Sequence, residues 1–220
     1  MSTSGGTGLN AMAYVVIIVV ALVVAGRANG DPGRTLTRPS RAVLVIWAVV
    51  AVPSVLQFAF PVLLDVLSRR PELVADGQVW RLLTAPVVQD GGVFGTVSNL
   101  IYLYVVACAA VPIWGGVRTA ALLVVGAVGF DLLATFVYPQ FGAGNSAATF
   151  VLVATLPAAL AVWRRGWWAV AAVAVTAAVG VGLLALGDAH GFAFLGGLVL
   201  GAATALVAAP AGMPGSPTPR

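Results

Sequence analysis

Apolar residues form long blocks along this chain, separated by short stretches that contain proline, glycine or arginine. A helix needs about 20 predominantly apolar residues (roughly 17–25) to cross a bilayer, and each block is close to that length. Pro112 and Pro139 follow two of the blocks, where helix breakers are expected. The pattern predicts seven transmembrane helices, over Leu9–Gly26, Ala42–Leu64, Val93–Val111, Val117–Tyr138, Ser146–Val162, Trp167–Leu186 and Ala189–Ala208.

The composition agrees with this prediction. Of the 220 residues, 60% are hydrophobic and 8% are charged, whereas a soluble domain carries about 25% charged residues. The sequence therefore predicts an all-α, multi-pass integral membrane protein. All eleven basic residues are arginines scattered between the apolar blocks, so we expect no nucleic-acid partner. The single histidine and the single cysteine, Cys108, exclude an internal disulfide and argue against a metal site, and we expect no cofactor.

The arginines predict how the helices are oriented. If the N-terminus lies outside, seven crossings place eight arginines in the cytoplasm and only Arg69, Arg70 and Arg81 outside, as the positive-inside rule expects. No basic residue precedes the first block, unlike in a signal peptide, so we expect a retained helix. Residues 1–41 then form a tail, an extra transmembrane helix and a basic cytoplasmic linker. Residues 42–209 form a six-helix core, and residues 1–8 and 210–220 are expected to be disordered.

Two polar residues stand at the starts of two apolar blocks, Ser146 and the only histidine, His190. The predicted topology puts both near the outer surface at the same depth. A serine hydroxyl becomes a nucleophile when a base accepts its proton, and imidazole does so near neutral pH. A serine at a helix start is also a common N-cap, and a histidine there can be an interfacial residue without a catalytic role. The pair predicts hydrolytic chemistry if the two side chains meet.

Three further sequence patterns accompany this pair. Gly77 to Thr84 reads GQVWRLLT, within a long segment after the second block; Trp80 beside Arg81 also suits a simple interfacial anchor. Gly144 to Ala148 reads GNSAA, in which Gly144 permits a tight turn into the helix of Ser146. After His190, small residues recur at four-residue intervals on one helical face, where they allow close packing against the helix of Ser146: Ala193, Gly197 and Gly201.

In this order, the patterns resemble those of the rhomboid family of intramembrane serine proteases. The resemblance covers about Ala42 to Ala208 and implies a six-helix rhomboid-like transmembrane core plus one extra N-terminal transmembrane helix. It implies a Ser146–His190 dyad without an acid, although Asp188 is close in sequence. Phe150, one turn after Ser146, is expected to stack on the imidazole.

The chain departs from the family in the groups that bind the oxyanion. The family carries a histidine and an asparagine four residues apart, and this chain has Gly95 and Asn99 at those positions. Gln89 stands where the family has a second histidine. We expect Asn99 and the backbone N–H of Ser146 to donate to the oxyanion; an asparagine in a membrane also commonly bonds two helices together. Asp131, a charged residue inside a block, is expected to make a polar contact near the cavity.

The function implied is cleavage of transmembrane segments of other membrane proteins near the outer face of the cell membrane. The alternative is a catalytically inactive relative that binds such segments without cutting them. A small transporter would need repeated halves and several intramembrane charges, and the sequence has neither.

Overall fold

The computed structural model describes residues 8–29 and 32–211, and within them the protein is all-α. Of the tails predicted over residues 1–8 and 210–220, residues 1–7 and 212–220 lie outside the described residues, and Gly8 is the first residue of a helix, which corrects the prediction there. One isolated antiparallel bridge, Arg69 with Gly142, is the β-type pairing in the described chain. The helices are α1 (Gly8–Asn29), α2 (Pro32–Thr37), α3 (Arg41–Leu56), α4 (Val62–Leu67), α5 (Pro71–Ala75), α6 (Arg81–Thr84), the 3₁₀ helix η1 (Ala85–Val87), α7 (Gly92–Trp114), α8 (Gly116–Phe136), α9 (Ser146–Arg164), α10 (Trp167–Ala185) and α11 (His190–Val207).

Five of these helices, α7 to α11, are long and apolar enough to cross a membrane, which supports a multi-pass membrane protein. The apolar part of α1, Tyr14–Arg27, and the helix α3 are shorter. With 16 residues, α3 is about 24 Å long, less than the roughly 30 Å of a bilayer's hydrocarbon core. For five of the predicted segments the structure confirms helices long and apolar enough to cross a membrane, and for the first two the transmembrane helix stays a prediction.

The second predicted segment is wrong at its end. It was expected to run to Leu64, but α3 ends at Leu56 and the apolar residues of α4 form a separate helix. Pro61 explains the interruption, since a residue that precedes proline is disfavoured in helical conformation. Gln57, just past the end of α3, is instead joined to Gln89 by two hydrogen bonds of 2.8 Å. In the opposite sense, α7 continues through Pro112 to Trp114, beyond the predicted break.

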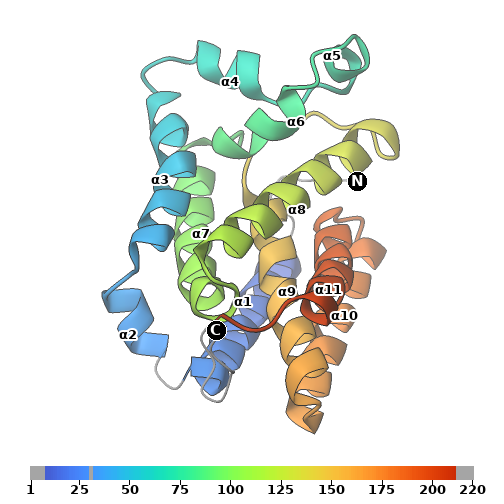
Figure 1. The fold of residues 1–220 in the computed structure, drawn as a ribbon. Coiled ribbons are helices and arrows are strands. Elements are labelled where there is room, and N and C mark those ends of the chain that lie inside the picture. Colours follow the sequence, from blue (N-terminus) through green and yellow to red (C-terminus); the bar gives the residue numbers. More distant parts are fainter. Residues whose placement is uncertain (1–7, 30–31, 212–220) are drawn as a thin grey trace.

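Helix α9 is the centre of the bundle, with α1, α7, α8, α10 and α11 packed around it (Figure 1). Every residue from Ala147 to Leu160 is buried. A helix that is apolar on all sides belongs in a protein interior, and the hydroxyl groups within α9 find partners there. The indole of Trp114, for example, donates to Thr155 Oγ1 at 3.0 Å. The core of the protein thus surrounds the helix that begins with Ser146.

Helix α11 packs directly on α9 through its glycines. A Cβ atom at Gly197 would lie 2.4 Å from the carbonyl oxygen of Val151, and one at Gly201 would lie 2.5 Å from Thr155 Cα. Both distances are too short for any side chain, so the two backbones are near contact. This packing aligns the starts of α9 and α11 at one end of the bundle.

We expect Gly197→Ala to destabilise the protein by about 1–3 kcal/mol, the usual effect of overpacking, because the added methyl group must push α11 away from α9. The measurement is the thermal midpoint of the purified protein in detergent. Gly196→Ala is the matched control, since a Cβ at the neighbouring Gly196 meets nothing within 4 Å. Equal midpoints for the two variants would contradict the close packing.

A layer of short helices, α4, α5 and α6, covers the end of the bundle where α9 and α11 begin (Figure 1). Arg81 holds this layer together and is buried. Its guanidinium donates to the carbonyl oxygens of Asp65 and Ser68 at 2.9 and 2.8 Å and to Gln78 Oε1 at 2.8 Å. The neighbouring Trp80 is 47% exposed on the outside of the layer. We conclude that this arginine stabilises the loop structure through carbonyl groups, while the tryptophan is available to an interface.

Candidate active site

The hydroxyl of Ser146 and the imidazole of His190 meet at the end of the bundle covered by the short helices. Ser146 is the first residue of α9 and His190 the first of α11, and Ser146 Oγ lies 2.9 Å from His190 Nε2. The imidazole is 4% exposed, whereas Ser146 is only partly buried. This is the hydrogen-bond distance expected between a nucleophile and its base.

Ser146 does not serve as the N-cap of its helix. The N-cap position belongs to Asn145, and the Ser146 hydroxyl is directed at His190 instead. As the first residue of α9, Ser146 contributes one of the backbone N–H groups that have no partner within a helix. These groups are free to stabilise a negative oxygen beside the serine.

Gly144 shapes the turn that leads to Ser146. Its φ of +132° is unfavourable for any residue with a side chain. A Cβ at this position would also lie 3.1 Å from Gln89 Oε1 and 3.3 Å from Asn99 Nδ2. The backbone N–H of Gly144 donates to the carbonyl oxygen of Ala85 at 2.9 Å, which joins this turn to the covering layer.

A cavity of about 410 Å³ opens beside the pair. Its wall includes Ser146 and His190 together with Gly95, Asn99 and Asp131. The volume is much larger than a single water molecule needs, and the wall is both polar and apolar. A Cβ at Gly95 would meet nothing within 4 Å, so this position on the wall faces open space. The cavity can admit both water and a peptide segment to Ser146.

Asn99 is on the cavity wall, but Gln89 is not available as a donor. Asn99 Nδ2 donates to Gln89 Oε1 at 2.8 Å, which leaves its second amide hydrogen for other partners. Gln89 is fully buried, and its Nε2 donates to Ser54 Oγ at 3.1 Å and to Asn145 Oδ1 at 2.8 Å. Of Asn99 and Gln89, only Asn99 therefore lines the cavity with an amide hydrogen left to donate.

The expected stacking of Phe150 on the imidazole is wrong. The Phe150 ring meets His190 edge-on, with centroids 5.2 Å apart and planes at 81°. The ring nearly parallel to the imidazole is Phe130 of α8, at 6.0 Å and 15°. Tyr14 of α1 and Phe194 of α11 stack on Phe150 instead, at 4.7 and 4.9 Å, and this packing fixes its orientation.

The expectation that His190 has no acidic partner is also wrong. Asp188 Oδ1 lies 2.8 Å from His190 Nδ1 and also accepts the backbone N–H of His190 at 2.9 Å. The Tyr14 hydroxyl donates to Asp188 Oδ2 and lies 3.1 Å from His190 Nδ1. Burial would raise the pKa of Asp188, but the hydrogen bonds from His190 and Tyr14 outweigh it and hold the pKa below its ordinary value. The acid is therefore ionised at neutral pH.

Asp131 makes a polar contact at the cavity, as its position in the sequence predicted. It forms a buried ion pair with Arg69, whose Nε also donates to the Gln140 carbonyl at 3.2 Å. The Arg69 guanidinium lies 5.8 Å from the centroid of Phe130, the ring that faces His190. This pair connects the covering layer to the wall of the cavity.

The site combines a serine hydroxyl, an imidazole in contact with it, an ionised carboxylate behind the imidazole and a cavity of about 410 Å³. These groups together have the chemistry of acyl transfer. Among the described residues, no group of three or more His, Cys, Asp and Glu side chains is arranged to hold a metal ion. Comparison of the chain with protein-family models, with curated proteins and with solved structures found no match.

Proposed function

We propose that this protein is an intramembrane serine protease with a rhomboid-like core, formed by α3 and α7 to α11, and with α1 as an additional helix. The observation that carries the proposal is the 2.9 Å contact between Ser146 Oγ and His190 Nε2 at the wall of a cavity. Both residues begin helices that are long and apolar enough to span a membrane. A surface serine that only caps a helix would need neither the base nor the cavity.

The chemistry proposed is hydrolysis of a peptide bond through an acyl-enzyme. Ser146 Oγ attacks the carbonyl carbon while His190 Nε2 takes the hydroxyl proton, and the carbonyl oxygen becomes an oxyanion. When the carbon–nitrogen bond breaks, His190 gives this proton to the departing amine. Water then attacks the ester with His190 as base, and the proton returns to Ser146 as the acid product leaves. The N–H of Ser146 and the amide of Asn99 are the groups proposed to stabilise the oxyanion.

The substrates proposed are transmembrane segments of other proteins. The catalytic pair lies at the ends of apolar helices, where a segment within the bilayer would arrive from the side. A peptide bond inside a helix is shielded by its own hydrogen bonds, so substrate segments must unwind locally before Ser146 can reach them. Segments with helix-breaking residues should therefore be cut most readily.

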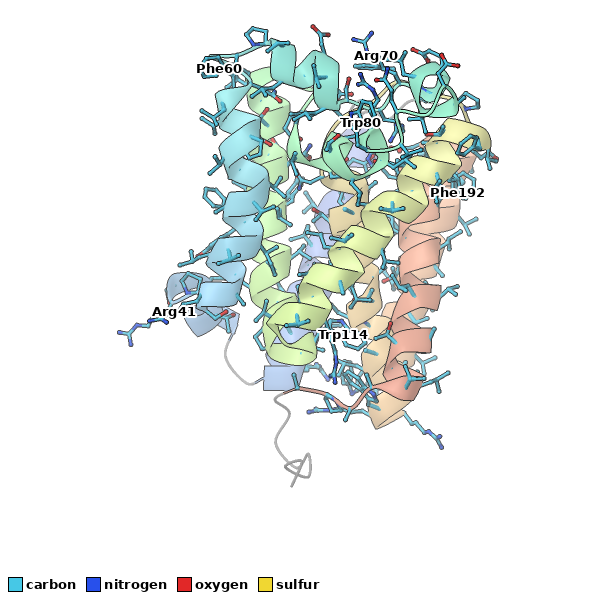
Figure 2. All side chains as sticks on the ribbon, turned by 45° about the horizontal axis from the view of Figure 1, so that its top comes forward. Arg41, Phe60, Arg70, Trp80, Trp114 and Phe192 are labelled. Carbon is cyan, nitrogen blue, oxygen red and sulfur yellow. The ribbon has the colours of Figure 1, made fainter. Side chains whose placement is uncertain are left out.

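The orientation proposed places the cavity toward the outer face of the cell membrane. Arg70 and Trp80 lie at the covered end of the bundle, and Arg41 and Trp114 lie at the other end (Figure 2). Arg164, at the end of α9, donates to the carbonyl oxygen of Arg27, so these two arginines also share the end opposite Ser146. The larger group of arginines is thus distant from the cavity, as the positive-inside rule requires of a cavity that faces outward.

One observation favours the second candidate function, a protein that binds transmembrane segments without cutting them. Gly95 faces the cavity and has no side chain with which to donate a hydrogen bond to an oxyanion. Such a protein would have no use for a base on Ser146. The two candidates differ in the reactivity of this serine.

The experiment is to treat the purified full-length protein in detergent with a fluorophosphonate, which forms a covalent bond with activated serines as fluoride leaves. We expect labelling at Ser146, identified by mass spectrometry of the peptides. The other serines that the structure describes are the internal control, because none of them has an imidazole hydrogen-bonded to its hydroxyl. Labelling that is absent, or that is spread over exposed serines, would reject the protease in favour of the binding protein.

A further inference from the structure

Behind His190 is a chain of hydrogen bonds that continues away from Ser146. It runs from His190 Nδ1 to Asp188 and from Asp188 to the hydroxyl of Tyr14. Asp188 precedes α11 by two residues, whereas Tyr14 is more than 170 residues away on α1. The N-terminal helix therefore reaches the candidate active site with a polar group.

The hydrogen bonds determine which nitrogen of the imidazole carries the proton. The Tyr14 hydroxyl has one hydrogen, which it gives to Asp188 Oδ2, so it has only an oxygen lone pair to offer to His190 Nδ1. Asp188 Oδ1, as part of an ionised carboxylate, is also an acceptor. Both neighbours of Nδ1 require a hydrogen on that nitrogen. Nε2 is then unprotonated and presents its lone pair to the Ser146 hydroxyl, 2.9 Å away.

The same contacts fix the position of the carboxylate. Asp188 Oδ1 accepts the backbone N–H of His190, and the N–H of Asp188 donates to the Leu183 carbonyl at 2.8 Å, at the end of α10. Oδ2 is held by Tyr14. The position of the carboxylate is therefore fixed by hydrogen bonds to His190, to Tyr14 and, through the Asp188 backbone, to α10. Such partners orient a histidine in the way that carboxylates behind metal-binding histidines do.

We propose that Asp188 and Tyr14 are positioning residues, which hold His190 in the tautomer and orientation that can accept the proton of Ser146, and that α1 is thereby part of the active site. This inference rests on the proposed protease function. Neither residue touches the substrate; both act through His190.

Helix α1 is well placed for this role. It packs against α7, α9 and α10, and Ile17, Ala21 and Val24 on its inner face are buried. The ring of Tyr14 stacks on Phe150 of α9 at 4.7 Å and meets His190 edge-on at 5.5 Å. The ring contacts position the hydroxyl, so Tyr14→Phe removes the hydrogen bond and keeps the packing.

The test measures the second-order rate constant of fluorophosphonate labelling at Ser146 across pH, in full-length variants. We expect Asp188→Asn to lower the rate by about 10²- to 10⁴-fold, since an amide can stabilise the wrong tautomer and cannot balance an imidazolium. Tyr14→Phe should lower it by about 10- to 100-fold, the usual effect of losing one hydrogen bond to a charged group. Asp76→Asn, an exposed carboxylate on the covering layer, and Val15→Ala, an exposed neighbour of Tyr14, are the matched controls and should label as the unaltered protein does.

The pH profile separates positioning from a merely structural role. Asp188→Asn removes the negative charge that faces the imidazole, so the acid limb of the labelling profile moves to lower pH. The other ionisable groups that line the cavity with His190 are Tyr14 of α1, Tyr102 of α7, Asp90 and the Arg69–Asp131 pair, and Asp188→Asn leaves all of them in place. Asp188→Glu keeps the charge and should retain the position of the acid limb even if the rate falls.

The outcomes distinguish the two proposals. If the unaltered protein is labelled at Ser146 and both Asp188→Asn and Tyr14→Phe match it in rate and profile, the positioning role is overturned and the protease proposal stands. If the unaltered protein is not labelled at Ser146, the protease proposal itself fails. Should Asp188→Asn fail to fold, Tyr14→Phe decides alone: a rate equal to that of Val15→Ala overturns the inference.

Discussion

Ser146→Ala and His190→Ala are each expected to abolish cleavage of a transmembrane substrate while the protein remains folded. In the proposed mechanism Ser146 attacks the peptide carbonyl, and His190 Nε2, which lies 2.9 Å from Ser146 Oγ, accepts the hydroxyl proton. In serine hydrolases the loss of either group lowers turnover by about 10⁶-fold, and the double variant is little worse than either single one because the two act as a unit. The measurement is the rate of product formation in detergent or in reconstituted vesicles.

The control for this experiment is Thr149→Ser on the same helix, a small change at a buried residue that does not line the cavity and that keeps the hydroxyl bonded to Asn145 Nδ2. This variant should retain cleavage. All of the variants should remain folded, as judged from their thermal midpoints. Substantial cleavage by either Ser146→Ala or His190→Ala would mean that another group is the nucleophile or base. Loss of activity accompanied by loss of folding in His190→Ala would leave Ser146→Ala as the deciding variant, because removing the single hydroxyl oxygen of a partly buried serine creates no sizeable cavity.

The helices could largely be predicted from the sequence because lipid imposes a length and an apolar composition on any spanning segment. The same rule gave a wrong prediction for the end of α3, which was expected at Leu64 and lies at Leu56. The apolar run of α4 has the composition of a membrane helix, and only Pro61 and the polar Gln57 mark the interruption. Composition alone does not distinguish an apolar helix that crosses the membrane from one that lies at its end.

The meeting of Ser146 and His190 could be predicted because each begins an apolar helix and the two starts share one end of the bundle. The small residues after His190 gave a reason for the two helices to touch, and in the structure Gly197 and Gly201 are pressed against α9. The lengths of the apolar segments predict that the two residues lie at the same end of the bundle, and the spacing of the small residues predicts that the two helices pack closely. The contact between Ser146 and His190 could therefore be predicted from the sequence alone.

The surroundings of the pair could not be predicted in the same way. Tyr14 is a single aromatic residue in an aliphatic helix, with no spacing that links it to residues 188 or 190. Its contact with Asp188 depends on how α1 packs against the bundle, which is a tertiary property. Asp188 is close to His190 in the sequence, but the resemblance to a family that uses no acid led to the prediction that Asp188 has no role at the site. The orientation of Phe150 likewise depends on Tyr14, which occupies the position beside its ring.

The polar network around Gln89 explains why a second large effect is expected at Asn99 and how it must be measured. Asn99 Nδ2 donates to Gln89 Oε1, so removal of the asparagine leaves a buried acceptor without this donor. That loss should destabilise the protein by about 1–3 kcal/mol. Ser54→Ala is the matched control, because Ser54 accepts from Gln89 Nε2 in the same network and is not part of the cavity wall.

Asn99→Ala is expected to lower turnover by about 10²- to 10³-fold, or roughly 2.7–4 kcal/mol, the usual effect of removing one oxyanion donor. The expectation follows from the cavity wall: Gly95 has no side chain to donate and Gln89 gives its amide hydrogens to Ser54 and Asn145. Asn99 is then the side-chain donor left to assist the N–H of Ser146. Ser54→Ala should lower the thermal midpoint to a similar degree with turnover nearly unchanged, so the difference in turnover between the two variants isolates the oxyanion contribution. If Asn99→Ala cleaves as fast as Ser54→Ala, the oxyanion is held by backbone N–H groups at the start of α9, and Asn99 serves only to hold Gln89 in place.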